Sequence, residues 1–318
     1  MTDAGTRVVL VTGASSGIGL ATAVQSAEAS DHVVLLARGR SALESAAEEC
    51  RRAGAASVRV AAVDVTDADA VGGLVADLLA SHGVIDAVVH CAGVVAYGRF
   101  EDVPEEVFDQ VISTNVLGAA NVVRSVLPSM RERDHGTIVL LGSVLGTIAA
   151  PTMSAYAISK WGVRSLARQL QIENRDRSGV HICCVSPGGV DTPIYLQAAN
   201  YLGRVGRPPP PAVSPEKVAS TVLGVLRRPR ARVNVGAANP LMTFGFTVLP
   251  GVFDALVGPL FALAATDERH RVEPGTGNVL RSVPDGNRLR GEQAGSLTAI
   301  ALILRSRATD AVRTATRR

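Results

Sequence analysis

The feature that most constrains how this chain folds is the regular alternation of short apolar segments and helical stretches over its first 190 residues. The apolar segments are rich in Val, Ile and Leu and lack a clear polar–apolar alternation, as parallel strands covered on both faces do. They are Arg7–Thr12, His32–Ala37, Ser57–Val63, Ile85–Cys91, Thr137–Leu141 and Val180–Val185. The helical stretches between them are Ile18–Ala29, Ser41–Ala53, Asp67–Ser81, Glu105–Arg133 and Ser154–Asp176. This order predicts an α/β fold with one doubly wound parallel sheet.

Beyond residue 190 the pattern becomes less regular. Ser214 followed by Pro215 predicts the start of another helix, which leads to a last strand near Arg232–Val235. Residues 194–213 contain few helix signals and a run of prolines, so we expect a mobile loop there. Everything after this last strand is expected to form a C-terminal extension.

A glycine-rich loop follows the first predicted strand and opens the first predicted helix. It reads Thr12-Gly13-Ala14-Ser15-Ser16-Gly17-Ile18-Gly19. Glycines let the backbone turn sharply and approach a pyrophosphate, which then sits on the free N–H groups of the helix N-terminus. The position between strand and helix makes the pattern far more specific than glycines alone. The loop therefore predicts a dinucleotide site.

The second predicted strand ends at Arg38, with no Asp or Glu beside it. Sites that prefer NAD place an acidic residue there for the ribose 2′-hydroxyl, whereas a guanidinium suits the 2′-phosphate of NADP. We therefore expect NADP(H), with NAD as the less suited cofactor. The alternative is that Arg38 is a solvated loop arginine.

Tyr156 and Lys160 are four residues apart in a predicted helix, so their side chains face the same side. Only two of the 32 basic residues are lysines, Lys160 and Lys217, so a lysine here indicates chemistry that a guanidinium cannot supply. A nearby ammonium favours the phenolate and would bring the tyrosine pKa, ordinarily about 10, closer to neutrality. We predict that Tyr156 is an acid/base for carbonyl chemistry. The alternative is a surface pair on a helix.

The glycine spacing and the Tyr-x3-Lys motif together resemble the short-chain dehydrogenase/reductase family over about residues 6–235. The resemblance implies that Ser143, 13 residues before Tyr156, orients the substrate oxygen and that Asn115 anchors a proton-relay water. It implies that Lys160 also binds the ribose, and it gives no role to a metal. The implied cofactor contacts are Gly13, Ser15, Ser16, Gly17, Ile18, Gly19, Arg38, Asp64, Val65, Cys91, Ala92, Gly93, Tyr156, Lys160, Pro187, Gly188, Val190 and Thr192.

The chain departs from the family pattern after the fourth predicted strand. The family usually has Asn-Asn-Ala-Gly there, and this chain has His90-Cys91-Ala92-Gly93. The second asparagine ties neighbouring backbone segments together, which a thiol does only weakly. We interpret the change as a stability variant, with a redox thiol at Cys91 as the alternative. His90 is expected to be a packing residue.

The C-terminal part differs in charge and polarity from the rest. Residues 1–200 contain 15 Lys and Arg against 21 Asp and Glu, and residues 201–318 contain 17 against 8. The basic part could face phosphates, an anionic membrane, a partner or only solvent. Leu241–Ala265 has a single charge, Asp254, but its central carboxylate and its prolines argue against a membrane span. Two interpretations remain open: a lid or wall over the substrate pocket, or an element at a membrane surface, helped by the amphipathic segment Ser296–Arg318.

These observations predict a catalytic domain over residues 1–238, with 194–213 as substrate loop, and an apolar, then basic extension over 239–318. The expected activity is NADP(H)-dependent hydride transfer to or from a lipophilic carbonyl or alcohol of steroid, retinoid, fatty-acyl or terpenoid type. The alternative is a catalytically silent NADP-binding scaffold or sensor. A sugar epimerase fits the glycine spacing less well, and nucleic-acid binding has only the charge in its favour.

The family resemblance further implies a dimer or tetramer formed through the predicted helices 105–133 and 154–176. Four cysteines without CxxC spacing and the absence of a secretory pattern predict a reducing compartment. We therefore expect a cytoplasmic protein, with a peripheral membrane location as the alternative.

Overall fold

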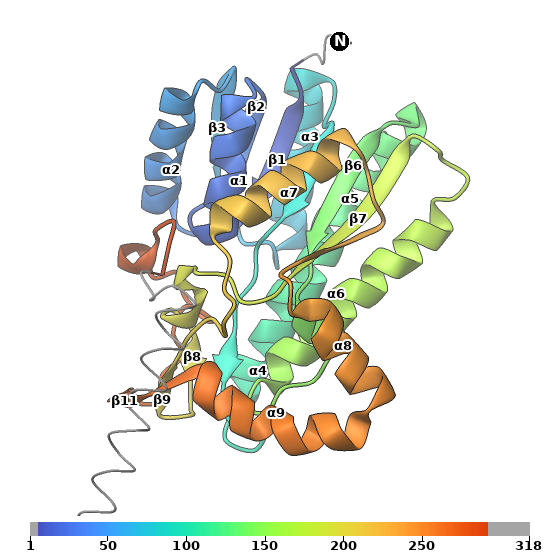
Figure 1. Cartoon of the computed structure of the whole chain (residues 1–318). Helices are drawn as coiled ribbons and strands as arrows, with labels where there is room; N and C mark the ends of the chain where they lie inside the picture. Colours follow the sequence, from blue (N-terminus) through green and yellow to red (C-terminus); the bar gives the residue numbers. More distant parts are fainter. Residues whose placement is uncertain (1–5, 292–318) are drawn as a thin grey trace, which may run out of the picture.

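The computed structural model describes residues 6–291, and its centre is a parallel sheet with helices on both faces (Figure 1). The sheet has seven strands in the order β10-β7-β6-β4-β1-β2-β3, and every neighbouring pair is parallel. The strands are β1 (Val8–Thr12), β2 (His32–Ala37), β3 (Ser57–Ala62), β4 (Ala87–His90), β6 (Gly136–Leu141), β7 (Val180–Pro187) and β10 (Arg232–Val235). The predicted doubly wound α/β fold is confirmed.

Two hydrophobic cores explain why the strands are apolar without alternation. On β1, Leu10 points into one core, and Val9 and Val11 point into the other. The first core is covered by α3 (Ala68–His82), α5 (Gly118–Arg133) and α6 (Ser154–Glu173). The second is covered by α1 (Gly17–Glu28), α2 (Arg40–Ala53) and α7 (Pro215–Arg227). Since both faces of the central strands β1, β4 and β6 are covered, both sets of their side chains must be apolar.

The stretch predicted as one helix over Glu105–Arg133 is not continuous. It consists of α4 (Glu105–Ile112), a π-helical turn at Ser113–Leu117 and α5. Within the turn, the Gly118 N–H donates to the Ser113 carbonyl, five residues back. Such turns occur frequently at functional sites, and this one contains Asn115.

The segment predicted as a mobile loop, 194–213, contains two short strands. β8 (Ala199–Asn200) pairs with β5 (Ala96–Tyr97), and β9 (Arg204–Gly206) pairs with β11 (Thr266–Arg271). The expectation of a loop throughout was wrong because the partners of both strands lie far away in the sequence.

Two helices follow the last strand of the sheet, α8 (Asn239–Val248) and α9 (Pro250–Ala264). They form a hairpin on the side toward which the carboxyl ends of the strands point (orange in Figure 1). After β11 the chain continues without long elements to residue 291, with a 3-10 turn at Pro284–Gly286. Within residues 6–291, no helix is long and apolar enough to cross a membrane. The predicted segment Ser296–Arg318 lies outside the described residues.

Candidate active site

A pocket lies at the carboxyl ends of the central strands, where the strand order reverses between β1 and β4. This switch point is the usual ligand site of an open α/β sheet. Most of the predicted cofactor residues line the pocket: Gly13, Ser15, Ser16, Gly17, Ile18, Gly19, Arg38, Asp64, Val65, Cys91, Ala92, Gly93 and Thr192. Tyr156, Lys160, Pro187, Gly188 and Val190 were also predicted and are not in its lining.

The glycine loop fits closely against the segment after β4. A Cβ at Gly13, which has a φ of +66°, would lie 2.8 Å from the Ala92 nitrogen. The Ala92 N–H also donates to Thr12 Oγ1 over 3.1 Å. Ser16 is the N-cap of α1 and makes no capping bond with its side chain. A compact glycine loop and the N-terminus of a helix thus face the pocket, so these residues fit the pyrophosphate of a dinucleotide.

At His90-Cys91, where the chain departs from the family pattern, a histidine hydrogen bond joins the neighbouring strands. His90 Nδ1 lies 3.0 Å from Thr12 Oγ1, so the histidine links β4 to β1. Burial lowers the pKa of His90 to about 3, so the ring is neutral. Burial raises the pKa of the Cys91 thiol to about 12, which disfavours the reactive thiolate. Both findings support a structural rather than a redox role.

Arg38 is not a solvated loop residue. Its guanidinium donates to the backbone carbonyls of Asn278, over 2.5 Å, and of Val279, over 3.1 Å. Burial lowers the pKa of Arg38 below the usual arginine value, and the nearby Asp64 carboxylate opposes this decrease. The residue predicted to read the 2′-phosphate is thus held by the C-terminal extension.

Ser143, Tyr156 and Lys160 meet next to this pocket. Ser143 begins a 3-10 turn after β6, and its Oγ accepts the Leu145 N–H over 3.1 Å. The Ser143 hydroxyl lies near enough to the Tyr156 phenol to influence its pKa. Lys160 Nζ lies 5.5 Å from the centroid of the Tyr156 ring and donates to the Leu141 carbonyl over 2.9 Å. The structure therefore brings these three predicted residues into one group.

Asn115 is buried and joins this group to the strand ends. Its Oδ1 accepts the Val94 N–H over 2.8 Å, and its Nδ2 donates to the Ser159 Oγ over 2.8 Å. A Cβ at Gly93 would lie 3.2 Å from Asn115 Oδ1 and 3.7 Å from Lys160 Nζ. Asn115 and Lys160 thus flank Gly93, at the inner end of the pocket lining. The predicted water-anchoring role of Asn115 stays a prediction.

The pKa of Tyr156 moves in the direction opposite to the one predicted from the sequence. Burial raises it to about 12, and the nearby Ser143 hydroxyl opposes this increase. The predicted lowering does not occur because burial of the phenol, which disfavours the charged phenolate, is the larger effect. Burial lowers the pKa of Lys160 itself to about 8. Tyr156 therefore carries its proton at neutral pH.

Several lining residues were not predicted from the sequence. Gln197 follows the turn at Pro193–Tyr195, and the others belong to the last part of the described chain: Asn278, Ser282, Val283 and Asn287. They have no motif, because their position depends on how the extension folds back. Among residues 6–291 there is no group of three or more His, Cys, Asp or Glu side chains placed to hold a metal ion.

A glycine-rich loop at the switch point of a doubly wound sheet defines a dinucleotide-binding α/β protein. The short chain dehydrogenase family model matches residues 7–200, and this chain belongs to that family. Family members use nicotinamide cofactors, so the class of reaction is oxidoreduction.

The similar proteins agree with this assignment. The chain is 34% identical over 275 residues to oxidoreductase UcpA of Salmonella typhimurium, covering 86% of this chain and 92% of that protein. It is 32% identical to glycine betaine reductase ATRR of Emericella nidulans over 70% of its own length, but spans only 18% of that longer protein. A short-chain dehydrogenase from Streptomyces avermitilis has a similar structure, with a TM-score of 0.67, 28% identity and coverage of 79% and 96%. A metagenomic short-chain oxidoreductase solved in complex with NADP has a TM-score of 0.62 and 26% identity, with coverage of 72% and 97%.

Proposed function

We propose that this protein is an NADP(H)-dependent oxidoreductase acting on the carbonyl or secondary alcohol of a lipophilic substrate. The observation that carries the proposal is the grouping of Ser143, Tyr156 and Lys160 at the end of a dinucleotide-type pocket. A bound nicotinamide dinucleotide supplies or accepts the hydride. The proton has to come from the protein.

We assign each of the four residues a role that its position supports. Tyr156 holds its proton at neutral pH, so it donates to the substrate oxygen when a carbonyl is reduced. Ser143 orients that oxygen through the hydroxyl that contacts Tyr156. The Lys160 ammonium stabilises the negative charge that remains, and Asn115 keeps the Val94 backbone and Ser159 in position around it.

The preference for NADP(H) rests on Arg38. Its guanidinium lines the nucleotide end of the pocket, where it can bind two oxygens of a 2′-phosphate. The solved metagenomic relative that was crystallised with NADP is consistent with this preference. In this proposal NADH binds more weakly, because it lacks the phosphate.

A lipophilic substrate is supported by the inner side of the α8–α9 hairpin. Phe261 of α9 packs against the same small apolar cluster as Tyr156, formed by Val95, Tyr97, Met153 and Ala198. Thr243 of α8 is hydrogen-bonded to Thr147, just after the Ser143 turn, over 3.1 Å. We propose that the hairpin, as part of the extension over 239–318, forms an apolar wall next to the reacting carbon.

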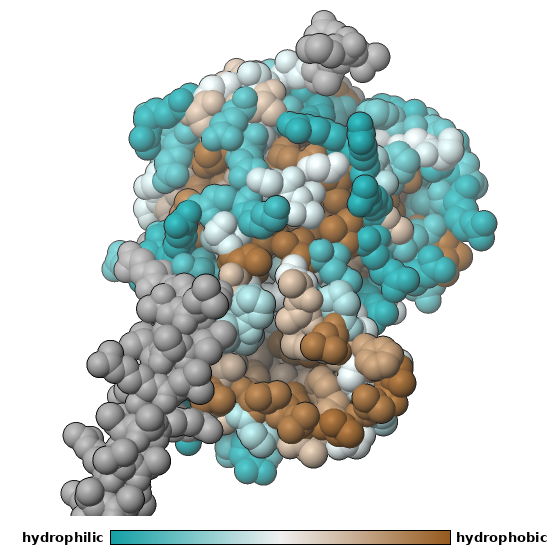
Figure 2. Space-filling view, viewed as in Figure 1, coloured by the Kyte–Doolittle hydropathy of each residue, from teal (hydrophilic) through white to brown (hydrophobic). Residues whose placement is uncertain are grey.

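The outer side of the same hairpin supports contact with a membrane surface. No residue of α9 is buried, and Figure 2 shows a continuous apolar band over this part of the molecule. The exposed large side chains are Leu241, Phe244, Val248, Leu249, Val252, Leu256 and Leu260. We propose a cytoplasmic protein that lies on a lipid surface through this band. The four free cysteines agree with a reducing compartment.

We propose that the protein forms a homodimer or homotetramer through the helices of residues 105–133 and 154–176, which are α4, α5 and α6. Large apolar side chains remain exposed there at the end of the π-turn and along α6: Leu117, Ile158, Trp161 and Ile172. A second copy of the chain would cover them. Light scattering of the purified protein measures the assembly directly.

The test is Tyr156→Phe, assayed with NADPH and with NADH against ketones and aldehydes of increasing chain length. Removal of the proton donor is expected to lower kcat about 10²- to 10⁴-fold and to leave the Kd for NADPH unchanged. Tyr201→Phe, a partly buried tyrosine outside this group, is the matched control. Binding of NADPH without turnover of any carbonyl by the wild type would favour the silent scaffold instead.

A further inference from the structure

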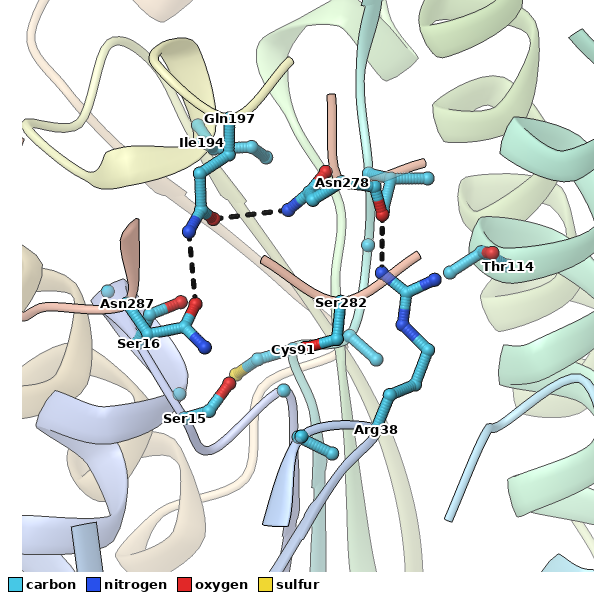
Figure 3. Close-up of a pocket in the computed structure, with 18 of the residues that line it drawn as sticks. Ser15, Ser16, Arg38, Cys91, Thr114, Ile194, Gln197, Asn278, Ser282 and Asn287 are labelled. Atoms are coloured by element: carbon cyan, nitrogen blue, oxygen red, sulfur yellow. Dashed lines mark hydrogen bonds between the residues drawn. The ribbon is translucent and has the colours of Figure 1, made fainter. Parts of the chain in front are cut away.

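The nucleotide end of the pocket is covered by a part of the chain that no motif predicted. Residues 276–291, here called the strap, cross the pocket mouth, and Asn278, Ser282, Val283 and Asn287 line the pocket from this side. Figure 3 shows Gln197 pointing toward Asn278 and Asn287 of the strap, and the Arg38 guanidinium beside Asn278. The strap therefore forms part of the wall at this end of the pocket.

The strap uses the groups that the dinucleotide requires. The Arg38 guanidinium is bound to the backbone carbonyls of Asn278 and Val279. The Gly17 N–H, in the first turn of α1, donates to the Arg288 carbonyl over 3.0 Å. Both the predicted 2′-phosphate ligand and a donor of the glycine loop are thus occupied by carbonyl oxygens of one segment.

The strap also leaves little space. The pocket has a cavity volume of about 160 Å³, whereas sites for small molecules and cofactors usually have about 300–1,000 Å³. A Cβ at Gly39, next to Arg38, would lie only 2.7 Å from the Ser282 Oγ. The strap thus approaches the backbone at the end of β2 closely.

The strap is held by polar contacts and by Val279, which is buried in a small apolar cluster with Val94 and Ala96. Gln197 Nε2 donates to Asn287 Oδ1 over 3.0 Å, and Gln197 Oε1 accepts from Asn278 Nδ2 over 3.1 Å. Arg290 forms an exposed ion pair with Glu216 on α7 over 2.8 Å. These polar contacts contribute modestly to stability. No strap residue is a buried member of the two cores that flank the sheet, so the strap can open while the sheet stays folded.

We propose that the strap is an autoinhibitory segment that competes with the dinucleotide, which binds only after the strap has opened. The inference rests on the proposed function for the identity of the ligand. In the open state the Arg38 guanidinium releases the carbonyls of Asn278 and Val279 and can bind phosphate oxygens in their place. The Gly17 N–H, released from the Arg288 carbonyl, becomes accessible to the dinucleotide. The measured Kd is then the intrinsic Kd divided by the open fraction, for NADPH and NADH alike.

The first test locks the strap by a disulfide. A Cβ at Gly39 would lie 3.8 Å from the Ser282 Cβ, which is the usual separation in a disulfide. The double variant Gly39→Cys/Ser282→Cys is compared oxidised and reduced, with Ser282→Cys alone as control, by the fluorescence of bound NADPH. We expect the oxidised form to lose binding by more than about a hundredfold and to regain it on reduction, as follows from removal of the open state.

Two results of this test would overturn the proposal. One is unchanged NADPH affinity in the oxidised form, because a closed strap would then be an ordinary wall of the site. The other is formation of the disulfide with NADPH retained inside. Failure of the two thiols to join under oxidation would contradict the close approach of Ser282 to Gly39 itself.

The second test loosens the strap. Gln197→Leu removes the side-chain bonds to Asn278 and Asn287 at nearly the same volume. A larger open fraction should tighten the binding of NADPH and of NADH by the same factor, about fivefold for the bonds lost. Gln171→Leu, which removes backbone contacts near β7 away from the pocket, is the matched control. Weaker binding in Gln197→Leu would mean that Gln197 and the strap hold the cofactor rather than exclude it.

The two proposals fail in different ways. If the reduced protein binds NADPH and NADH equally, the cofactor preference is wrong, and the effect of the disulfide still decides the role of the strap. If neither dinucleotide binds to the wild type or to Gln197→Leu, the proposed function is wrong and the strap has nothing to compete with.

Discussion

The two ends of the pocket are built from contacts between residues whose separation along the sequence is very different. At the catalytic end, Lys160 is held by the Leu141 carbonyl, 19 residues away, at the end of a neighbouring strand. At the nucleotide end, Arg38 is held by the Val279 carbonyl, 241 residues away, in the extension. The first contact forms whenever the sheet forms, whereas the second depends on how the chain folds back after the sheet is complete. The catalytic end is therefore part of the fold, and closure of the nucleotide end is separable from it.

The same difference holds for apolar residues. Leu10 on β1 is fully buried in the core, whereas Leu256 on α9 is 51% exposed. The sheet uses its leucines for stability, and the extension presents them to its surroundings. The predictions below test this division, from the largest expected effect to the smallest.

Leu10→Ala is expected to lower the free energy of unfolding by about 3 kcal/mol, because it leaves a cavity in a closed core. Leu256→Ala, the same substitution on the hairpin, is expected to change it by less than about 0.5 kcal/mol. Urea unfolding followed by circular dichroism measures both. Equal losses in the two variants would contradict the division between sheet and extension.

Lys160→Met is expected to stabilise the fold at pH 7 by about 2 kcal/mol while it abolishes turnover. Burial lowers the pKa of Lys160 to about 8, so below pH 8 the folded protein carries a buried ammonium at a cost that unfolding relieves. As the pH rises from about 8 toward the unfolded value of about 10.4, the folded lysine is neutral and the cost disappears. The advantage of the variant should therefore shrink over that range.

Urea unfolding of both proteins at pH 7 and pH 9.5 measures this change in the stability difference. Lys217→Met, at the only other lysine, is the matched control, because Lys217 is exposed at the start of α7. A constant difference at the two pH values would mean that the Lys160 ammonium has no desolvation cost. The catalytic end of the pocket would then hold the Lys160 charge without a cost to the stability of the fold.

Phe261→Ala is expected to raise KM for long-chain carbonyls about fivefold and to leave KM for short ones nearly unchanged. The reason is the loss of apolar area from the inner side of the hairpin, worth about 1 kcal/mol. Phe244→Ala, on the exposed outer side, is the control for this comparison. Steady-state kinetics with a series of ketones measures the effect. Equal changes for short and long substrates would remove the argument for a lipophilic wall.

The sequence by itself determined the sheet and much of the candidate site. Uninterrupted apolar strands, a glycine loop between strand and helix, and Tyr156 four residues before Lys160 all depend on neighbours in the sequence. The helix start at Ser214 and the doubly wound parallel sheet could be predicted for the same reason, since local periodicity and the alternation of strands and helices suffice.

Only the tertiary structure decided the rest. The π-turn around Asn115, the raised pKa of Tyr156 and the partners of β8 and β9 depend on burial and on contacts between distant segments. The strap is the strongest case, because Gly17, Arg38 and Gln197 meet residues 278–288 only after the chain has returned across the sheet. Such contacts use backbone carbonyls and single amide side chains, which leave no periodicity or motif in the sequence. Their positions are set by the packing of the whole chain rather than by the residues themselves.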